Sequence, residues 1–534
     1  MVNISSEATG AIGENSSMPG MVNRAMRMMF GTLASRLLGL LREILTANYF
    51  GASRSLDAFY VAYTIANLSR QLLAEGALSA SFVPTFSRVH AAKGPDAARA
   101  LARQVLTMLL CACSAVVLLG MLCSPLLVRA IAPGFDAEQS KMAVALTRAL
   151  FPFLIIVSVG ALAMGVLNSV GSFFVPAVAP AASNLAFIAI LLAFRRGISI
   201  WTMAVAVLAG GMCNMAMQWA MSCSMGYMLA PARPDTKDPD LRRAMALFLP
   251  CAAGLSLNQI NPIVGRMLGS FLDEGVISAL NYADRIIQLP LGLFVIAISQ
   301  AVLPMLSRLD PDDSEGFREF IRDALRFNLF IVLPAAVALV MLARPVVHLL
   351  LVRGAFGESA WGVTSGALAC YAAGLPGMAC NTVTMRALYS RSMPKAAVGV
   401  TCFTVCANLT LGLALMKPFA HVGLAMGTSG AFTGAAFFGA WRLSRDIGAK
   451  IRLFDPAWTL KVACSCLAMG GVLAFLFKIY PYPAGSAFAR RSVWMAVVMA
   501  TGCGVYAGAS RFLGCPEWGW IRGALARGAK KGDS

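Results

Sequence analysis

Charged residues are scarce in this sequence, and their scarcity excludes a soluble fold. They make up 13% of the 534 residues, whereas 58% are hydrophobic and the mean hydropathy is +0.71. A soluble domain carries about 25% charged residues. Apolar runs of about 20 residues, the length of a membrane-spanning helix, recur along the chain. The composition therefore predicts an all-α polytopic membrane protein.

Residues that bind metals or act in catalysis are also few. The chain has 3 histidines, and its 14 cysteines lie mostly inside apolar segments, where cysteine is a small packing residue. We therefore expect no zinc or iron–sulfur site and no disulfide. The sequence shows no nucleophile–base pair of the kind that enzymes use. We expect no enzyme activity and no resident metal or cofactor.

The net charge of +19 comes without any basic stretch that is interleaved with aromatic residues. This absence argues against a nucleic acid partner. Lysine and arginine instead mark the cytoplasmic loops of membrane proteins, and here they concentrate in the loops on the side of both chain ends. The bias predicts that both termini are cytoplasmic, with residues 1–23 and 514–534 as tails.

The apolar segments predict fourteen spanning helices. Six of them fall within residues 24–229, and six more fall within 241–445. A polar linker at 230–240 separates these two groups. The last two spans fall within 446–513. An even number of spans agrees with two termini on the same side of the membrane.

An internal repeat relates the two groups of six helices. DAFYVAYTIANL at 57–68 aligns with SALNYADRIIQL at 278–289, at an offset of 221. FVPTFSR at 82–88 aligns with VLPMLSR at 302–308, at an offset of 220. Because the offset spans six helices, both copies share one orientation in the membrane. We predict two six-helix lobes related by a pseudo-twofold axis along the membrane normal, plus two C-terminal helices.

Charges inside the predicted spans gather in the first two helices of each lobe. A charge at bilayer depth costs several kcal/mol unless it is paired or faces water. We expect these side chains to line a polar cavity for an anionic lipid headgroup, because arginine binds phosphate oxygens as a planar, permanently charged fork. The acids would hold the arginines in place and screen them. The candidate residues are Arg36, Arg42, Glu43, Asp57, Asn67, Arg70, Glu75, Arg266, Asp284 and Arg285.

A purely structural role for these charges is the alternative. Ion pairs such as Arg42 with Glu75, or Arg285 with Asp57, would hold helices together, and buried pairs occur for that reason alone. Asp57, near the outer end of its helix, is also placed to form a gate pair that closes one face of the cavity. The residues themselves leave these roles open.

Several motifs resemble one family. SRLLGLLRE at 35–43 and DAFYVAYTIANLSRQLLAEGALSASFVP at 57–84 are similar to the MurJ (MviN) lipid II flippases of the multidrug/oligosaccharidyl-lipid/polysaccharide (MOP) exporter superfamily. APGF at 132–135, VLNSVGSFFVPAVAP at 166–180 and NYADRIIQLP at 281–290 resemble it too. The resemblance implies a MATE-like fold in which the two C-terminal helices form a hydrophobic groove for a lipid tail.

The resemblance also implies a function. Such proteins move undecaprenyl-diphosphate-linked disaccharide-pentapeptide, or lipid II, from the inner to the outer leaflet of the bacterial cytoplasmic (inner) membrane by alternating access. Besides lipid II and membrane lipids, the glycan polymerases of the cell-wall machinery are implied partners. Acids of the family pattern match Asp57 and Glu75. The essential, diphosphate-binding arginines of the family match Arg36, Arg42, Arg70 and Arg266.

Departures from the family pattern bear on energy coupling. Gly265 stands where many members have Asp, and Gln288 stands where members often have Glu. Some members bind sodium through acids in spans 7 and 11, but no Asp or Glu lies within 245–272 or 359–445. We therefore do not expect a sodium site of that type. Another ion or the membrane potential, worth about 2.3 kcal/mol per charge per 100 mV, would supply the energy.

Three other functions stay open at this point. A flippase for another diphosphate-linked glycan would need the same arginines. A cation-coupled multidrug exporter of the same fold would need an acid-lined aromatic cavity, and the excess of arginine argues against it. A lipid-binding scaffold without transport is a further alternative.

Overall fold

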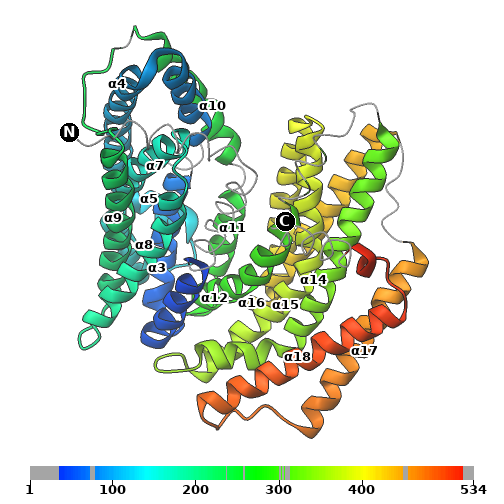
Figure 1. Ribbon diagram of the computed structural model, residues 1–534. Coiled ribbons are helices and arrows are strands. Elements are labelled where there is room, and N and C mark those ends of the chain that lie inside the picture. The colour runs from blue at the N-terminus through cyan, green and yellow to red at the C-terminus, as the bar shows by residue number, and fades with distance from the viewer. Residues whose placement is uncertain are drawn as a thin grey trace, which may run out of the picture. The chain divides into compact units, whose positions relative to one another are not determined.

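Figure 1 shows the computed structural model, whose described residues form helices joined by short loops. These residues are 35–71, 78–235, 237–256, 259–296, 298–299, 302, 306, 313–448 and 455–520. Among them there is no strand, and nine helices are long and apolar enough to cross a membrane. The predicted all-α membrane fold is confirmed, whereas the number of fourteen spans stays a prediction. The predicted tail at 1–23 and the candidate residue Glu75 lie outside the described residues.

The chain divides into two compact units. Unit 1 comprises the residues up to Phe50 and those from Arg54 to Ile263, and unit 2 comprises Gly51–Ser53 and the residues from Val264 onward. The lobe limits predicted from the sequence stay predictions. Unit 1 contains a helical stretch at 35–50, α3 (Arg54–Ser69), α4 (Leu78–Leu122), α5 (Ser124–Ile131), α6 (Ala137–Leu150), α7 (Phe153–Ser169), α8 (Phe174–Ala193), α9 (Ile200–Ser224), α10 (Pro239–Ser256) and the first turn of α11 (Ile260–Gly269).

Glycines shape the packing of unit 1. Gly94, with φ 84° and ψ 179°, kinks α4 between the second and third predicted spans. On α9, a Cβ atom at Gly210 would lie 2.8 Å from the carbonyl oxygen of Ser183 on α8. The missing side chain therefore lets α8 and α9 approach closely, as small residues do between membrane helices.

The predicted polar linker is fastened to α4. The Thr107 hydroxyl donates to the Ala232 carbonyl oxygen (2.7 Å) and accepts from the Ala232 amide (2.9 Å). At the start of α10, the Asp240 carboxylate accepts from Arg88 Nη2 at 2.9 Å and from Lys93 Nζ at 2.7 Å. These contacts tie the linker and α10 to unit 1.

Unit 2 holds the remaining helices. In α16 the backbone breaks at Ala420, with φ 47° and ψ −125°, which separates the eleventh and twelfth predicted spans. α15 and α16 pack closely because a Cβ atom at Gly374 would lie 2.3 Å from Ser429. The helices are the rest of α11, α12 (Val276–Pro290), η3 (Leu291–Val295), α14 (Ser314–Leu351), α15 (Glu358–Ser390), α16 (Pro394–Ile447), α17 (Pro456–Ile479) and α18 (Phe488–Phe512).

α3 and α12 carry the internal repeat and have matching limits. Their last residues, Ser69 and Pro290, are separated by the repeat offset of 221. Each helix follows a glycine with positive φ, Gly51 at 60° and Gly275 at 84°, a conformation that other residues adopt only at a cost. The second repeat match, at 302–308, lies mostly outside the described residues.

Candidate functional site

The first group of candidate residues lies in unit 1 around Arg42. Arg42 Nη2 donates to Glu43 Oε1 at 2.7 Å, and Arg42 Nη1 donates to Asn184 Oδ1 at 3.2 Å. The Tyr60 hydroxyl donates to the other oxygen of Glu43, at 3.2 Å. The Arg42 guanidinium carbon also lies 5.3 Å from the centre of the Phe187 ring. We call Arg42, Glu43, Tyr60 and Asn184 the Arg42 cluster.

The Arg42 cluster leaves part of its arginine open. Glu43 is 5% exposed, and both of its oxygens accept hydrogen bonds. The Arg42 side chain keeps 25% of its surface exposed. A guanidinium has five N–H donors, so the two bonds to Glu43 and Asn184 leave donors for a further anion. The arrangement can hold an arginine in place and still offer it to a phosphate.

The other candidates in unit 1 are placed as follows. Arg70, in the short π-helical stretch that follows α3, donates from Nε to Asn67 Oδ1 at 2.7 Å. Asp57 is buried in the first turn of α3. Arg36 is half-buried in the helical stretch at 35–50 and makes no hydrogen bond to another described side chain.

The alternative to anion binding is that these charges only form ion pairs that hold helices together. The acid that pairs with Arg42 is Glu43, its neighbour in sequence. The suggested partner Glu75 lies outside the described residues. The suggested pair of Arg285 with Asp57 would join the two units and stays a prediction.

A second group lies in unit 2, on α11 and α12. Arg266 Nη2 donates to Asn281 Oδ1 at 3.1 Å, and Asn281 is 3% exposed. One turn further on, Gln288 Nε2 donates to Asp284 Oδ2 at 2.6 Å, and Arg285 Nη1 lies 3.4 Å from Gln288 Oε1. We call these five residues the Arg266 cluster. Gln288, where the family often has Glu, bridges the acid and the arginine of its helix.

Sequence reasoning missed the partners Tyr60, Asn184 and Asn281. Tyr60 and Asn281 occupy the same position in the aligned segments 57–68 and 278–289. Each is linked to an arginine. Asn281 accepts directly from Arg266, whereas Tyr60 donates to Glu43, which in turn accepts from Arg42. The alignment contained this signal. Nothing in the sequence pointed to Asn184, which lies 142 residues after Arg42.

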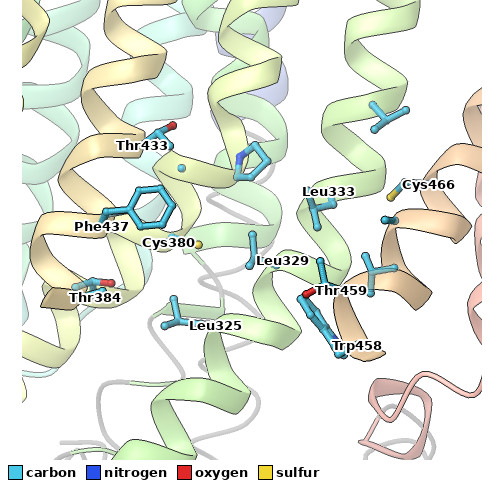
Figure 2. Close-up of a pocket in the computed structure, with 17 residues that line it drawn as sticks. Leu325, Leu329, Leu333, Cys380, Thr384, Thr433, Phe437, Trp458, Thr459 and Cys466 are labelled. Atoms are coloured by element: carbon cyan, nitrogen blue, oxygen red, sulfur yellow. The ribbon is translucent and has the colours of Figure 1, made fainter. Parts of the chain in front are cut away.

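An apolar cavity of about 380 Å³ lies between α14, α15, α16 and α17 in unit 2. Figure 2 shows Leu325, Leu329 and Leu333 of α14 on one wall, with Trp458 and Cys466 of α17 beside them. Its volume is within the range of roughly 300–1,000 Å³ that is usual for ligand pockets. The wall of this cavity can take hydrocarbon but offers almost no hydrogen bonds.

The segment after α18 contacts Trp458, one of the residues that line this cavity. The indole N–H of Trp458 donates to Glu517, which is 0% exposed. Trp458 packs in a core that also contains Trp494 and Tyr506 of α18. α17 and α18 lie side by side, as Figure 1 shows. α17 contributes to the cavity wall, and α18 packs against α17 outside the residues that line it.

Comparison with solved structures defines the class of protein. An inward-facing multidrug resistance MATE family transporter of the MOP superfamily has a TM-score of 0.64 at 17% identity, and covers 78% of this chain and 94% of that chain. A structure described as lipid II flippase MurJ, inward closed conformation, has a TM-score of 0.76 at 25% identity, and covers 91% of this chain and 98% of that chain. The fold is that of MOP-superfamily transporters.

Sequence comparison defines the family. The family model described as lipid II flippase MurJ matches residues 46–492. A probable lipid II flippase MurJ of Rhizobium tropici is 32% identical over 512 residues, which are 93% of this chain and 95% of that protein. The lipid II flippase MurJ of Burkholderia cenocepacia is 33% identical and covers 76% and 80%. The chain belongs to the MurJ family of lipid II flippases, and is a multi-pass membrane transporter and not an enzyme.

Proposed function

We propose that this protein translocates lipid II from the inner to the outer leaflet of the bacterial cytoplasmic membrane by alternating access. The observation that carries the proposal is the family match across 46–492, with relatives named for that activity over nearly the whole chain. In the proposed topology both termini are cytoplasmic, because the basic residues concentrate in the loops on their side. Glycan polymerases that consume lipid II would take the product.

The diphosphate of lipid II is the anion that this proposal assigns to Arg36, Arg42, Arg70 and Arg266. Bidentate arginine–phosphate hydrogen bonds are stronger than neutral ones and are directional. In the Arg42 cluster the guanidinium is already oriented by Glu43 and Asn184. An oriented guanidinium loses less side-chain entropy when an anion binds. Glu43 would neutralise Arg42 while no substrate is bound.

The isoprenoid tail is assigned to the apolar cavity beside α17. Burying hydrocarbon contributes about 0.8 kcal/mol per CH₂, and the lining side chains are leucine, valine, phenylalanine and tryptophan with a few threonines. At least one of these threonines, Thr433, donates to a carbonyl of its own helix, that of Ser429, at 2.8 Å. The Thr459 hydroxyl in this wall has no hydrogen-bond partner among the described residues. The rest of the wall is largely apolar, so the cavity suits an apolar chain.

A depletion experiment tests the proposed function. In a bacterium whose flippase is this chain alone, depletion should leave newly made lipid II inaccessible to probes added outside the cell, and re-expression should restore access. Normal labelling after depletion would overturn the proposal. Normal labelling together with accumulation of another diphosphate-linked glycan would assign the alternative substrate.

The cavity has its own test. Ala463 lines the cavity, whereas the next residue, Cys464, is exposed and does not line it. Ala463→Trp should place an indole in the tail site and weaken lipid II binding several-fold, since it removes the space for several buried CH₂ groups. Cys464→Trp adds the same ring outside the cavity and serves as the control. Equal lipid II binding by both variants would show that the tail does not occupy this cavity.

A further inference from the structure

Three arginines gather in unit 2 where α14 ends and α18 begins. Arg344 is in the last two turns of α14, Arg353 directly follows that helix, and Arg491 is in the first turn of α18. Their neighbours include His348, which is 9% exposed, and Tyr482 in the loop between α17 and α18. We call these five residues the His348 cluster. It is separate from the Arg42 and Arg266 clusters and has no part in the proposed translocation.

His348 fixes the orientation of Arg491. Arg491 Nη1 lies 3.2 Å from His348 Nδ1, and the Tyr482 hydroxyl lies 3.0 Å from the same nitrogen. A guanidinium can only donate, so Nδ1 accepts, and the imidazole is neutral with its proton on Nε2. Arg491 also hydrogen-bonds the Tyr482 hydroxyl, so these contacts use part of its five N–H donors. Its other N–H groups are held in a fixed direction and remain for another acceptor.

Arg353 is held by the C-terminal end of α14. Its Nη2 donates to the carbonyl oxygens of Leu349 and Leu350, at 2.8 and 3.0 Å, and so caps the C-terminus of α14. Its guanidinium carbon lies 5.6 Å from the centre of the Phe488 ring. Burial and the nearby Arg491 guanidinium lower the pKa of Arg353. Two like charges are therefore kept close together, an arrangement that a bound anion would relieve.

No carboxylate among the described residues forms an ion pair with Arg344, Arg353 or Arg491. The acid that interacts electrostatically with His348 is Glu358, an exposed residue in the first turn of α15. Elsewhere in the described chain, half-buried arginines such as Arg54 and Arg318 do pair with acids. The His348 cluster thus carries unneutralised positive charge at a fixed place.

Aromatic rings surround these charges. The Arg344 guanidinium carbon lies 5.6 Å from the centre of the Trp361 ring, whose indole N–H donates to the Arg344 carbonyl oxygen. Phe488 is 55% exposed. Aromatic rings and arginines at the ends of spanning helices lie at the level of lipid headgroups. A hydrogen-bond acceptor for these arginines would therefore lie at the membrane surface.

We propose that the His348 cluster is a binding site for the phosphate group of an anionic phospholipid. Arg353 and Arg491 hold the phosphate oxygens, His348 and Tyr482 position Arg491, and the acyl chains lie along exposed apolar residues of α17 and α18 such as Phe475 and Val493. Free phosphate has the same headgroup chemistry but no acyl chains. In the proposed topology the site faces the outer leaflet.

Lipid retention by the purified full-length protein tests this site. The measurement is native mass spectrometry after titration with phosphatidylglycerol or phosphatidylcholine, with and without excess inorganic phosphate. The wild type should retain phosphatidylglycerol about tenfold better than phosphatidylcholine, because the choline ammonium of phosphatidylcholine offsets its phosphate charge and is repelled by the arginines. The double variant Arg353→Gln/Arg491→Gln should lose that preference.

Arg490 provides the matched control. It is the exposed neighbour of Arg491, so Arg490→Gln removes a charge at the same end of α18 and should keep the preference. Arg491→Lys keeps the charge without the planar fork, and should give an intermediate preference even if the double variant fails to fold. Equal preference in the double variant and in Arg490→Gln would overturn the site. Loss of bound lipid on adding inorganic phosphate would show that the site binds free phosphate and not a phospholipid.

Discussion

Arg42 and Arg266 each lie nine residues before a glycine of positive φ, Gly51 and Gly275, that precedes a helix of the internal repeat. Their partners differ in kind. Arg42 donates to a carboxylate that is its neighbour in sequence, and Arg266 donates to the amide of Asn281 on the following helix. The position that supplies Asn281 in unit 2 supplies Tyr60 in unit 1. The two units thus place a carboxylate beside one arginine and an amide beside the other.

This difference matters for an anionic substrate. A carboxylate competes with phosphate for a guanidinium, whereas an amide oxygen competes less because it carries no net charge. Glu43 also screens Arg42 when no substrate is bound. The predictions below separate the contribution of each arginine from that of its partner.

The largest effect should come from the arginines themselves. Arg42→Gln and Arg266→Gln should each lower lipid II translocation roughly a hundredfold, because losing one partner of a buried, hydrogen-bonded charge pair costs about 2–5 kcal/mol. The probe-accessibility assay measures this, with Arg490→Gln as the control for loss of an exposed charge. Normal translocation in either variant would remove that arginine from the site.

Replacing Glu43 should mainly affect stability. Glu43→Gln leaves Arg42 without its acid and weakens the bond from Tyr60. We expect a loss of about 1–3 kcal/mol in the free energy of unfolding, less than for a fully buried pair because Arg42 is partly exposed. Thermal unfolding in detergent measures the change. An unchanged midpoint would mean that Asn184 alone holds Arg42.

A carboxylate introduced into the Arg266 cluster, like the one in the Arg42 cluster, should weaken substrate binding. Asn281→Asp places a carboxylate beside Arg266 and should weaken lipid II binding about tenfold, since the new acid competes with the diphosphate. Asn281→Ser, which keeps a neutral acceptor, is the control. If the aspartate variant binds as tightly as the wild type, an acid beside the arginine does not oppose the anion.

The hydrogen bond from Tyr60 should have a smaller effect. Tyr60→Phe removes only the hydroxyl that donates to Glu43 and should lower the free energy of unfolding by about 1 kcal/mol. Tyr63→Phe, one turn later on α3, removes a hydroxyl that makes no side-chain hydrogen bond within the described part of the chain. The two variants should differ in unfolding midpoint, and equal midpoints would show that Tyr60 is not needed to orient Glu43.

An exposed ion pair provides the smallest effect. Asp136 caps α6 by accepting from the Gln139 amide at 2.9 Å, and it pairs with Arg54. The Gln139 amide and the Arg54 guanidinium lower the pKa of Asp136. Its contribution to stability is therefore present above the usual carboxyl pKa and is lost as pH falls through the lowered value. Asp136→Asn should flatten this part of the stability–pH curve, and an unchanged curve would contradict the assignment.

The sequence predicted much of the fold because spanning helices leave a direct signal. The apolar runs of the sequence predict spans at 317–351, 361–390 and 457–479, and these limits lie within a few residues of α14, α15 and α17. Breaks inside continuous helices were harder to place. The kink at Gly94 and the break at Ala420 leave hydrogen-bonded helix on both sides, so only the change in polarity marked them.

The site was predictable where charge stood out against an apolar background. Arg42, Glu43, Arg70 and Arg266 were found in this way. Neutral partners carry no such contrast. Asn281 was recoverable from the repeat, whereas Asn184 meets Arg42 only through the packing of α8 against the first helical stretch. Contacts between residues so far apart in sequence depend on tertiary packing, which local patterns do not encode.

Binding of lipid II to the purified protein in lipid nanodiscs tests the central claim most directly. The comparison needs the wild type, Arg42→Gln, Arg266→Gln and the exposed control Arg490→Gln. If both arginines hold the diphosphate, each of the two variants should bind at least about tenfold more weakly than the wild type, while the control binds as the wild type does. Wild-type affinity in either Arg42→Gln or Arg266→Gln would contradict a diphosphate site that uses both arginines.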